Sequence, residues 1–380
     1  MNIMNTKPVF DKSKLQSKIR GSLIGGAIGD ALGYQIEFDN DIKDKQVTRF
    51  RDDLGIISDD TQMTLFTANA LLWRHTRWCI RGIAMHNEKA VYHGYLDWYK
   101  TQTFKGNNGA ASLIKEAWLK TDHIKDHTQI CWLTDVEDLH KRQAPGNTCL
   151  TSLRSGKMGT IEAPINNSKG CGGVMRIAPC GLINRTPNSS GYLAAQCSAI
   201  THGHPLSHLA SYMCAALISI LTYQNITLED AVQEAFTLAK EHHKDFNISD
   251  DNLKAFVAMM EKAIELSHTE TKSDAATIKS IGGGWTAEDA LAIAIYACLK
   301  YKSFEDIIIC AANHDGDSDS TAAIAGNIIG AYLGVEAIPE YYIEHVELRD
   351  TILEVADDLC TALTDDYFER DANWQKKYFM

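Results

Sequence analysis

Glycine spacing near the two ends of the chain constrains its fold more than any other feature of the sequence. In RGSLIGGAIGDALGYQIEF, glycines recur at positions 21, 25, 29 and 33, and a second series recurs at 326, 330 and 334. A spacing of four residues places positions on one face of an α-helix. Because each glycine costs a helix interior about 1 kcal/mol relative to alanine, we predict two helices that pack backbone to backbone. The alternative is that one or both segments are glycine-bearing loops.

An acidic loop precedes the second glycine series. In HDGDSDST, residues 314–321, three aspartates alternate with small residues at the expected start of a helix. A helix N-terminus favours negative charge, but carboxylate and hydroxyl oxygens are also the ligands that hard divalent cations prefer. The two hypotheses are therefore a metal site and a solvated helix cap. An EF-hand is excluded, because a loop starting at Asp315 has Ser320 and Gly326 where that motif requires Gly and Glu.

A second acidic cluster opens another helical pattern. Ser58 is expected to cap this helix, with Asp59 and Asp60 in its first turn. Taken alone, the cluster indicates a helix cap, whereas beside the acidic loop it repeats the same hydroxyl and carboxylate chemistry. Glu37, seven residues after Asp30, shares a helix face with it next to the first glycine series.

Composition limits the class of protein. A formal net charge of -12 over 380 residues argues against nucleic-acid binding. No apolar run approaches the roughly 20 residues of a membrane span, and residues 1–18 lack the apolar core of a signal peptide. The ten cysteines include no C-x-x-C pair. We therefore expect a cytoplasmic protein with reduced, buried thiols and no membrane contact.

The segments between these motifs predict an all-α fold. Almost no stretch alternates polar and apolar residues with the period of a strand, and helical periodicity dominates. We expect a single compact orthogonal bundle of about a dozen helices. Residues 1–17 are expected to form a polar arm and residues 18–380 the domain. Short helical patches are expected at residues 112–119, and two amphipathic helices between residues 227 and 268.

Two further motifs indicate ligand contact. The glycine-rich stretch INNSKGCGGVMRIAP, residues 165–179, offers backbone N–H groups and small side chains to a ligand. It matches neither a Walker loop nor a dinucleotide fingerprint. The stretch THGHP spans residues 201–205. Its His204 lies four residues before His208, which follows the stretch, but no Glu or Cys completes a zinc motif. A hydrogen-bonding or ligand-contacting role is therefore expected for these histidines.

Taken in order, these segments resemble the ADP-ribosylglycohydrolase family, which includes the dinitrogenase-reductase-activating glycohydrolase and the ADP-ribosylarginine hydrolases. The matching motifs cover residues 18 to 335, and they are GSLIGGAIGDALGYQIEF, SDDTQMTLFTANAL, GNTCLTSL, NNSKGCGGVMRIAP, THGHP, GGGWTAEDALAIAIYACL and GDSDSTAAIAGNIIGAYLG. Two departures are small, since Ser58 stands where many members have Thr, and Cys171 lies inside the ligand-loop motif. The GDSDST form looks more like the arginine-linkage branch than the serine-linkage branch.

The resemblance implies a site with two Mg²⁺ or Mn²⁺ ions. Carried over position by position, the metal ligands would be Glu37, Ser58, Asp59, Asp60, Asp317, Asp319 and Ser320. Two divalent cations would balance four of the five carboxylate charges in this set, which otherwise repel one another. The acid or base would be Glu37, Asp59 or Asp60, and the sequence leaves the choice open. Loss of metal is expected to lower stability.

The implied activity is hydrolysis of the N-glycosidic bond between ADP-ribose and a protein arginine, so the expected partner is an arginine-modified protein. The substrate-binding candidates are Asp97, Asn147, Ser168, Gly170, Cys171, Gly172, Gly173 and His202. Asp97 is the candidate for contacting the arginine, the glycine-rich loop for the diphosphate, and His202 for the ribose or phosphate. Alternatives are hydrolysis of O-linked ADP-ribose, on serine or as O-acetyl-ADP-ribose, a non-catalytic binding protein, and an immunity protein that occludes a cognate ADP-ribosyltransferase.

Overall fold

The computed structural model describes residues 11–38, 46–103, 128–270 and 272–379. Within these ranges the chain forms sixteen α-helices and no sheet, which confirms the all-α prediction and exceeds the expected dozen. The helices are α1 (Lys12–Glu37), α2 (Asp59–Arg81), α3 (Asn87–Thr103), α5 (Asn147–Arg154), α6 (Ala178–Ile183), α7 (Pro187–Ala199), α8 (Pro205–Tyr223), α9 (Leu228–His242), α10 (Asp250–Ser267), α11 (Asp274–Ile281), α12 (Ala287–Lys300), α13 (Phe304–Ala312), α14 (Ser318–Leu333), α15 (Glu340–His345), α16 (Arg349–Thr364) and α17 (Ala372–Tyr378).

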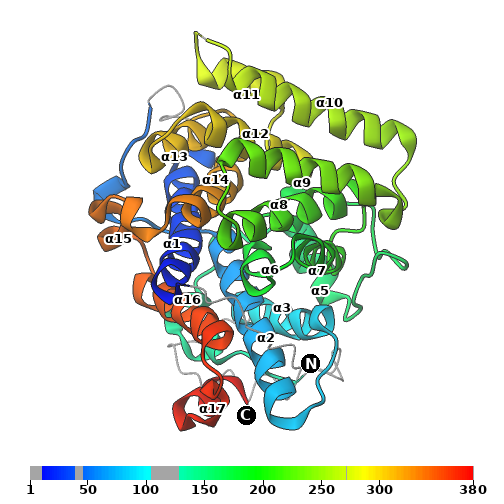
Figure 1. Ribbon diagram of the computed structural model, residues 1–380, viewed down its shortest axis with the longest axis vertical. Coiled ribbons are helices and arrows are strands. Elements are labelled where there is room, and N and C mark those ends of the chain that lie inside the picture. The colour runs from blue at the N-terminus through cyan, green and yellow to red at the C-terminus, as the bar shows by residue number, and fades with distance from the viewer. Residues whose placement is uncertain (1–10, 39–45, 104–127, 271, 380) are drawn as a thin grey trace, which may run out of the picture.

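Helices α1 and α14 pack against each other along the two glycine series, as predicted (Figure 1). A methyl group added to Gly25 would lie 2.7 Å from the carbonyl oxygen of Gly326. Ser22 Oγ donates a hydrogen bond to Asn327 O at 2.9 Å, and Asn327 Nδ2 donates to Ser22 O at 2.8 Å. At the glycine positions the two backbones therefore touch with no space for side chains between them, and both segments are helices rather than loops.

Helix α1 begins at Lys12, inside the segment that was expected to be a polar arm. Asp11 caps the helix, because its Oδ1 accepts hydrogen bonds from two backbone N–H groups of the first turn, at 3.0 and 3.3 Å. Leu15 is only 3% exposed and belongs to the hydrophobic core. Residues 12–17 are therefore part of the packed helix, and residues 1–10 lie outside the described residues.

Helix α8 lies inside the bundle and contacts α6, α7, α9, α12 and α14. It is 19 residues long with a mean hydropathy of 1.4, so by length and composition it could cross a membrane. This corrects the expectation that no apolar run approaches that length. Other helices bury 94% of its apolar stretch, as expected for the core helix of a globular domain.

The remaining helices extend the bundle around this centre. Helices α9 and α10 are the two amphipathic helices expected between residues 227 and 268. In Figure 1, α10 and α11 lie at one end of the longest axis and α17 lies at the other. The helical patches expected at residues 112–119 lie outside the described part of the chain.

The crossing of α1 and α14 generates a stability prediction. A methyl group at Gly29 would lie 2.0 Å from the carbonyl oxygen of Ala322, a backbone atom that cannot turn away. We expect Gly29→Ala to lower the free energy of unfolding by about 3 kcal/mol, measured by denaturant unfolding followed by circular dichroism. The matched control is Gly146→Ala, where φ is −57° and the nearest atoms to a new methyl group are 3.7 Å away. Equal stability of the two variants would contradict the close crossing.

Candidate active site and metal centre

Several helix ends and the glycine-rich loop enclose a cavity of about 670 Å³. The end of α1, the starts of α2, α5 and α14, and the loop before α6 all contribute to its wall. The residues that line the cavity are Glu37, Phe38, Asp59, Asp60, Arg142, Ala144, Pro145, Gly146, Asn147, Thr148, Cys149, Gly170, Cys171, Gly172, Met175, His202, Trp285, Asp317, Asp319 and Ser320.

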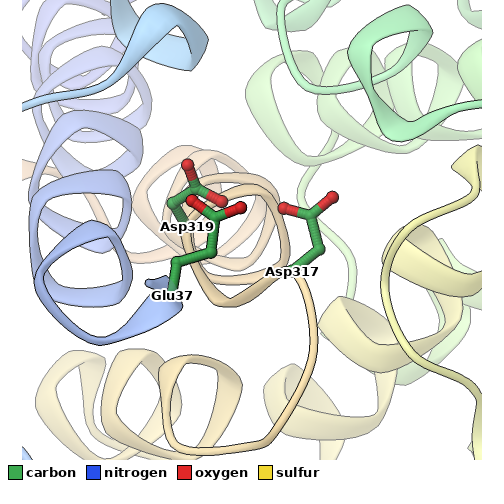
Figure 2. A group of neighbouring side chains, drawn as sticks. All are labelled: Glu37, Asp317 and Asp319. Atoms are coloured by element: carbon green, nitrogen blue, oxygen red, sulfur yellow. The ribbon is translucent and has the colours of Figure 1, made fainter. Parts of the chain in front are cut away.

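Three carboxylates from the two ends of the chain meet in this cavity. Figure 2 shows the side chains of Glu37, Asp317 and Asp319, and one oxygen of each lies within 4.8 Å of the others. Glu37 is the last residue of α1, and Asp317 is the N-cap residue of α14. Because Gly33 packs directly against the backbone of Ser318, the close crossing brings the end of α1 beside the start of α14.

The first turn of α2 supplies two further carboxylates. Ser58 is the N-cap residue, and its Oγ accepts a hydrogen bond from Asp60 N at 3.2 Å, as the sequence predicted. Asp59 Oδ2 accepts a hydrogen bond from Gly146 N at 3.0 Å. Asp60 is only 2% exposed, and its Oδ2 has no hydrogen-bond partner within the described ranges. A buried oxygen of this kind calls for an additional partner such as a cation.

Asp30 positions this turn, although it does not line the cavity. It is fully buried in α1, and its two oxygens accept hydrogen bonds from Ser58 N at 2.9 and 3.0 Å and from Thr61 N at 3.1 Å. The sequence placed Asp30 on the same face as Glu37 but assigned it no function. In the fold it connects α1 to the start of α2, so it orients the two carboxylates without contacting the cavity.

Burial and mutual repulsion raise the pKa values of the clustered carboxyl groups. Burial, followed by the charges of Asp319 and Asp317, raises the pKa of Glu37 to about 10. Burial is also the main reason why the pKa of Asp59 rises to about 8 and that of Asp60 rises well above its usual range. In the absence of a cation, part of the cluster therefore retains protons at neutral pH.

The glycine-rich loop approaches the edge of an imidazole ring. A methyl group at Gly170 would lie 3.4 Å from His202 Nε2, and one at Gly172 would lie 3.0 Å from His202 Cε1. His202 Nδ1 shares a hydrogen bond with Thr201 Oγ1 at 2.8 Å. Burial, followed by the charge of Arg176, lowers the pKa of His202 well below its usual value. The ring is therefore neutral at physiological pH and offers a hydrogen-bonding edge to the cavity.

The N-terminus of α5 opens onto the same cavity. Its first two residues, Asn147 and Thr148, line the wall beside Arg142. Unpaired N–H groups at a helix start together with a guanidinium favour an anionic ligand. Sequence reasoning selected Asn147 but missed Arg142, which lies in no recognisable motif. It also missed Trp285, which lines the cavity and is 52% exposed, although three consecutive glycines before it marked the position.

Arg176 lies behind the cavity wall and was also missed. It is fully buried, its Nη1 lies 3.2 Å from Cys149 Sγ, and its guanidinium carbon lies 4.2 Å from the centre of the Tyr95 ring. Its positive charge lowers the pKa of Asp59 and so partly opposes the effect of burial there. The residue therefore adds a fixed positive charge behind a negatively charged cavity.

Three other predicted residues lie outside the cavity lining. The side chain of Ser58 is engaged in capping α2. Ser168 Oγ shares a hydrogen bond with Thr148 Oγ1 at 3.3 Å and holds the loop against α5. Gly173 is buried, and a methyl group there would lie 2.2 Å from Ser207 Oγ. Within the glycine-rich loop, the residues that line the cavity are therefore Gly170, Cys171, Gly172 and Met175.

Asp97 requires a correction. It was expected to contact the arginine of the substrate, but it is fully buried in α3 and does not line the cavity. Its Oδ2 accepts hydrogen bonds from Ile130 N at 2.9 Å and Cys131 N at 3.0 Å. The carboxylate thus anchors the chain that follows residue 127. Its position in an aromatic-rich helix gave no indication of this contact.

The donor set fits a hard divalent cation. Five carboxylates and the hydroxyl of Ser320 line one cavity, and such oxygens are the usual ligands of Mg²⁺ and Mn²⁺. Glu37 Oε2 and Asp60 Oδ2 are buried oxygens without a hydrogen-bond partner in the described part of the chain. A bound cation would supply that partner and relieve the repulsion that raises the pKa values.

An all-α bundle whose helix ends gather five carboxylates around a cavity offers a donor set that suits a divalent cation. Residues 11–369 match the family model described as ADP-ribosylglycohydrolase, and the chain belongs to this family. A solved ADP-ribosylglycohydrolase-related protein complex has the same fold, with a TM-score of 0.57 and 22% identity, over 92% of this chain and 99% of that chain. The resemblance seen in the sequence is thereby confirmed.

Two curated relatives illustrate the range within the family. The chain is 38% identical over 71 residues to ADP-ribosylarginine hydrolase Tri1 of Pseudomonas putida, which covers 19% of each chain. It is 22% identical over 197 residues to ADP-ribosylhydrolase ARH3 of Bos taurus, which covers 47% of this chain and 54% of the relative. The matched segments thus span 54% of the ARH3 relative and 19% of the Tri1 relative.

The raised pKa values predict how stability depends on pH and metal. The usual values are 3.8 for Asp and 4.5 for Glu, and in the folded protein Asp59 is raised to about 8 and Glu37 to about 10. At pH values between the usual and the raised pKa values, the folded state binds more protons than the unfolded state, so the free energy of unfolding falls as pH rises. With EDTA present, we expect the melting temperature to drop by roughly 5 °C or more between pH 5.5 and pH 8.5.

Added Mg²⁺ should remove most of this drop, because the cation stabilises the ionised carboxylates. Differential scanning calorimetry at both pH values, with EDTA or with Mg²⁺, checks the prediction. A metal-free protein whose melting temperature rises over this interval would contradict the proton-binding assignment.

Asp30 generates a second prediction. Asp30→Asn replaces one acceptor oxygen with an NH₂ group facing the N–H groups of Ser58 and Thr61, so the first turn of α2 should shift. We expect Mn²⁺ affinity, measured by isothermal titration calorimetry, to weaken roughly tenfold. The matched control is Asp97→Asn, which also alters a buried carboxylate with two backbone donors. It should lower the melting temperature but leave Mn²⁺ affinity unchanged, and equal weakening in both variants would refute the specific role of Asp30.

Proposed function

We propose that this protein hydrolyses the N-glycosidic bond that joins ADP-ribose to an arginine side chain of a modified protein, with two Mg²⁺ or Mn²⁺ ions. One observation carries the proposal: a carboxylate cluster, the N-terminus of α5 and Arg142 all line a single cavity. ADP-ribosyl-arginine has the matching polarity, because it carries a cationic guanidinium on the ribose and an anionic diphosphate beyond it.

The proposed metal ligands are those carried over from the family. They are Glu37, Ser58, Asp59, Asp60, Asp317, Asp319 and Ser320. Divalent cations supply Lewis-acid polarisation of bound oxygens and lower the pKa of bound water. Ser58 Oγ accepts one hydrogen bond, from Asp60 N at 3.2 Å, and would use its second lone pair to join the set. The other six side chains already line the cavity.

Asp60 is the proposed proton carrier among the three candidates. Asp59 Oδ2 is held by Gly146 N, whereas Asp60 Oδ2 has no protein partner within the described ranges. In the proposed reaction, the oxygen of a water molecule bonds to C1 of the ribose as the bond from C1 to the guanidinium nitrogen breaks. Asp60 takes a proton from the water and passes it to the leaving nitrogen, so the arginine leaves as a guanidinium ion. The transition state would be oxocarbenium-like.

Groups around the start of α5 would bind the diphosphate. The N–H groups at the start of α5, the Arg142 guanidinium and the backbone of Gly170 to Gly172 all adjoin the cavity. Together they provide the positive potential that an anion requires in a protein of negative net charge. His202, neutral because of its burial, would donate or accept a hydrogen bond at the ribose or phosphate edge.

A second candidate is hydrolysis of O-linked ADP-ribose. The alignment with ADP-ribosylhydrolase ARH3 extends over 197 residues, whereas that with the arginine hydrolase Tri1 covers 71. The longer alignment has lower identity, 22% against 38%. The linkage is therefore part of the proposal, and the experiment below compares the two substrates directly.

The test measures free ADP-ribose released from an ADP-ribosyl-arginine protein and from an ADP-ribosyl-serine protein, with Mg²⁺ or with EDTA. We expect Mg²⁺-dependent release from arginine only. The double variant Asp59→Ala/Asp60→Ala should lose at least about 10³-fold in rate, because it removes metal ligands and the proton carrier together. The matched control is Asp315→Ala, since Asp315 lies in the same acidic loop, is 69% exposed and faces Lys279 at 3.9 Å.

The possible outcomes separate the proposals. Release from serine alone would retain the site and replace the substrate. Release by the double variant at the wild-type rate would remove Asp59 and Asp60 from the mechanism. No release from either substrate by folded, Mg²⁺-loaded protein would refute the hydrolase proposal.

A further inference from the structure

A thiol lies among the oxygens of the proposed metal site. Cys171 lines the cavity, and its Sγ donates a hydrogen bond to Asp317 Oδ2 at 2.6 Å. Asp60 and Ser320, two further proposed oxygen ligands, line the same cavity. The hydrolysis described above gives Cys171 no chemical role.

Two buried carboxylate oxygens in the same cavity call for an additional partner. Asp60 Oδ2 and Glu37 Oε2 have no hydrogen-bond partner in the described residues, and the two side chains are only 2% and 9% exposed. Both residues line the cavity that Cys171 shares, and Figure 2 shows the carboxylate of Glu37 beside those of Asp317 and Asp319. Buried carboxylate oxygens without partners next to a thiol define a mixed oxygen and sulfur donor set for a cation.

The two donor types favour different cations. Mg²⁺ is held through oxygen, whereas Zn²⁺, Cd²⁺ and Co²⁺ accept thiolate sulfur as well as carboxylate oxygen. Met175 adds a second sulfur to the cavity wall, and its Sδ lies 3.9 Å from Ser320 Oγ. Neither sulfur is a ligand that Mg²⁺ prefers. The two sulfur atoms therefore favour a site that also accepts thiophilic cations.

We propose that Cys171 is a metal ligand that allows the carboxylate site at Asp317 to bind a thiophilic divalent cation such as Zn²⁺ or Cd²⁺. On binding, a bond forms between the cation and Sγ, and the thiol proton, now directed at Asp317 Oδ2, leaves to solvent. This inference rests on the metal site of the proposed function. The thiophilic cation would compete with Mg²⁺ for the same carboxylates, so Cys171 determines which metal occupies the site.

The test uses thiolate-to-metal charge-transfer absorption in the ultraviolet, a signal that oxygen ligands alone do not give. Cys79 is the only exposed cysteine among the ten of the chain, so the starting protein is the full-length Cys79→Ser variant. Cd²⁺ is titrated into this protein and into versions that also carry Cys171→Ser or Cys149→Ser. Cys149 is the matched control, because its thiol also lines the cavity but lies against Arg176.

We expect the absorption band in the starting protein and in the Cys149→Ser version, and its loss in the Cys171→Ser version. Competition with a chromophoric chelator should show that Cys171→Ser weakens Cd²⁺ binding at least about tenfold and changes Mg²⁺ binding by no more than about threefold. A band that persists without Cys171, that depends on Cys149 instead, or that is absent from the starting protein overturns the assignment.

Two readouts separate this inference from the proposed function. Mg²⁺-dependent release of ADP-ribose by the starting protein tests the hydrolase alone. Hydrolysis without a charge-transfer band would remove only the role of Cys171. A band without hydrolysis would retain the sulfur ligand and refute the proposed reaction.

Discussion

The backbone contact between α1 and α14 is the constraint on which the rest of the structure depends. Gly25 and Gly326 approach so closely that neither position has room for a side chain. This proximity fixes the end of α1 against the start of α14, and the carboxylates of Glu37 and Asp319 meet as a result. Glycine is disfavoured within helices. Its repeated use here allows a close packing of α1 against α14 that larger residues would prevent.

That arrangement concentrates negative charge in a buried place. Glu37, Asp317 and Asp319 each place an oxygen within 4.8 Å of the others, and burial opposes the ionisation of Glu37 and Asp317. Arg176 supplies little direct compensation, because it lies behind the wall and contacts sulfur, hydroxyl and aromatic groups. The cluster is therefore suited to a cation, and its stability should be linked to metal and to protons together.

Groups of opposite charge that line one cavity explain how a protein of negative net charge could accommodate an anionic ligand. Net charge acts over long distances, whereas a buried site depends on nearby groups whose field is screened less by water. The N-terminus of α5 and Arg142 line the same cavity as the carboxylates, and Gly146 N, directly before α5, donates a hydrogen bond to Asp59 Oδ2 at 3.0 Å. A ligand with a cationic and an anionic part would be oriented there by contacts of each part with groups of opposite charge.

Much of this could be read from the sequence, because the relevant signals are local or periodic. Four-residue glycine spacing indicated two closely packed helices, and Ser58 followed by two aspartates indicated a capped helix start. The acidic segments were grouped by their shared chemistry and by resemblance to the family. The start of α1 at Lys12 was missed, although Asp11 is a good capping residue, because the polar composition of the following turn suggested an arm.

The sequence by itself determined the all-α class, the close helix pair and the residue types of the acidic cluster. Only the tertiary structure decided which polar groups face the cavity. Asp97 and Asp60 are both aspartates in helices. The first bonds to the backbone at Ile130 and Cys131, whereas the second has, among the residues that the structure describes, an oxygen without a partner at the cavity. The physical reason is that a local pattern fixes the helix to which a side chain belongs, whereas its partners come from segments distant in the chain.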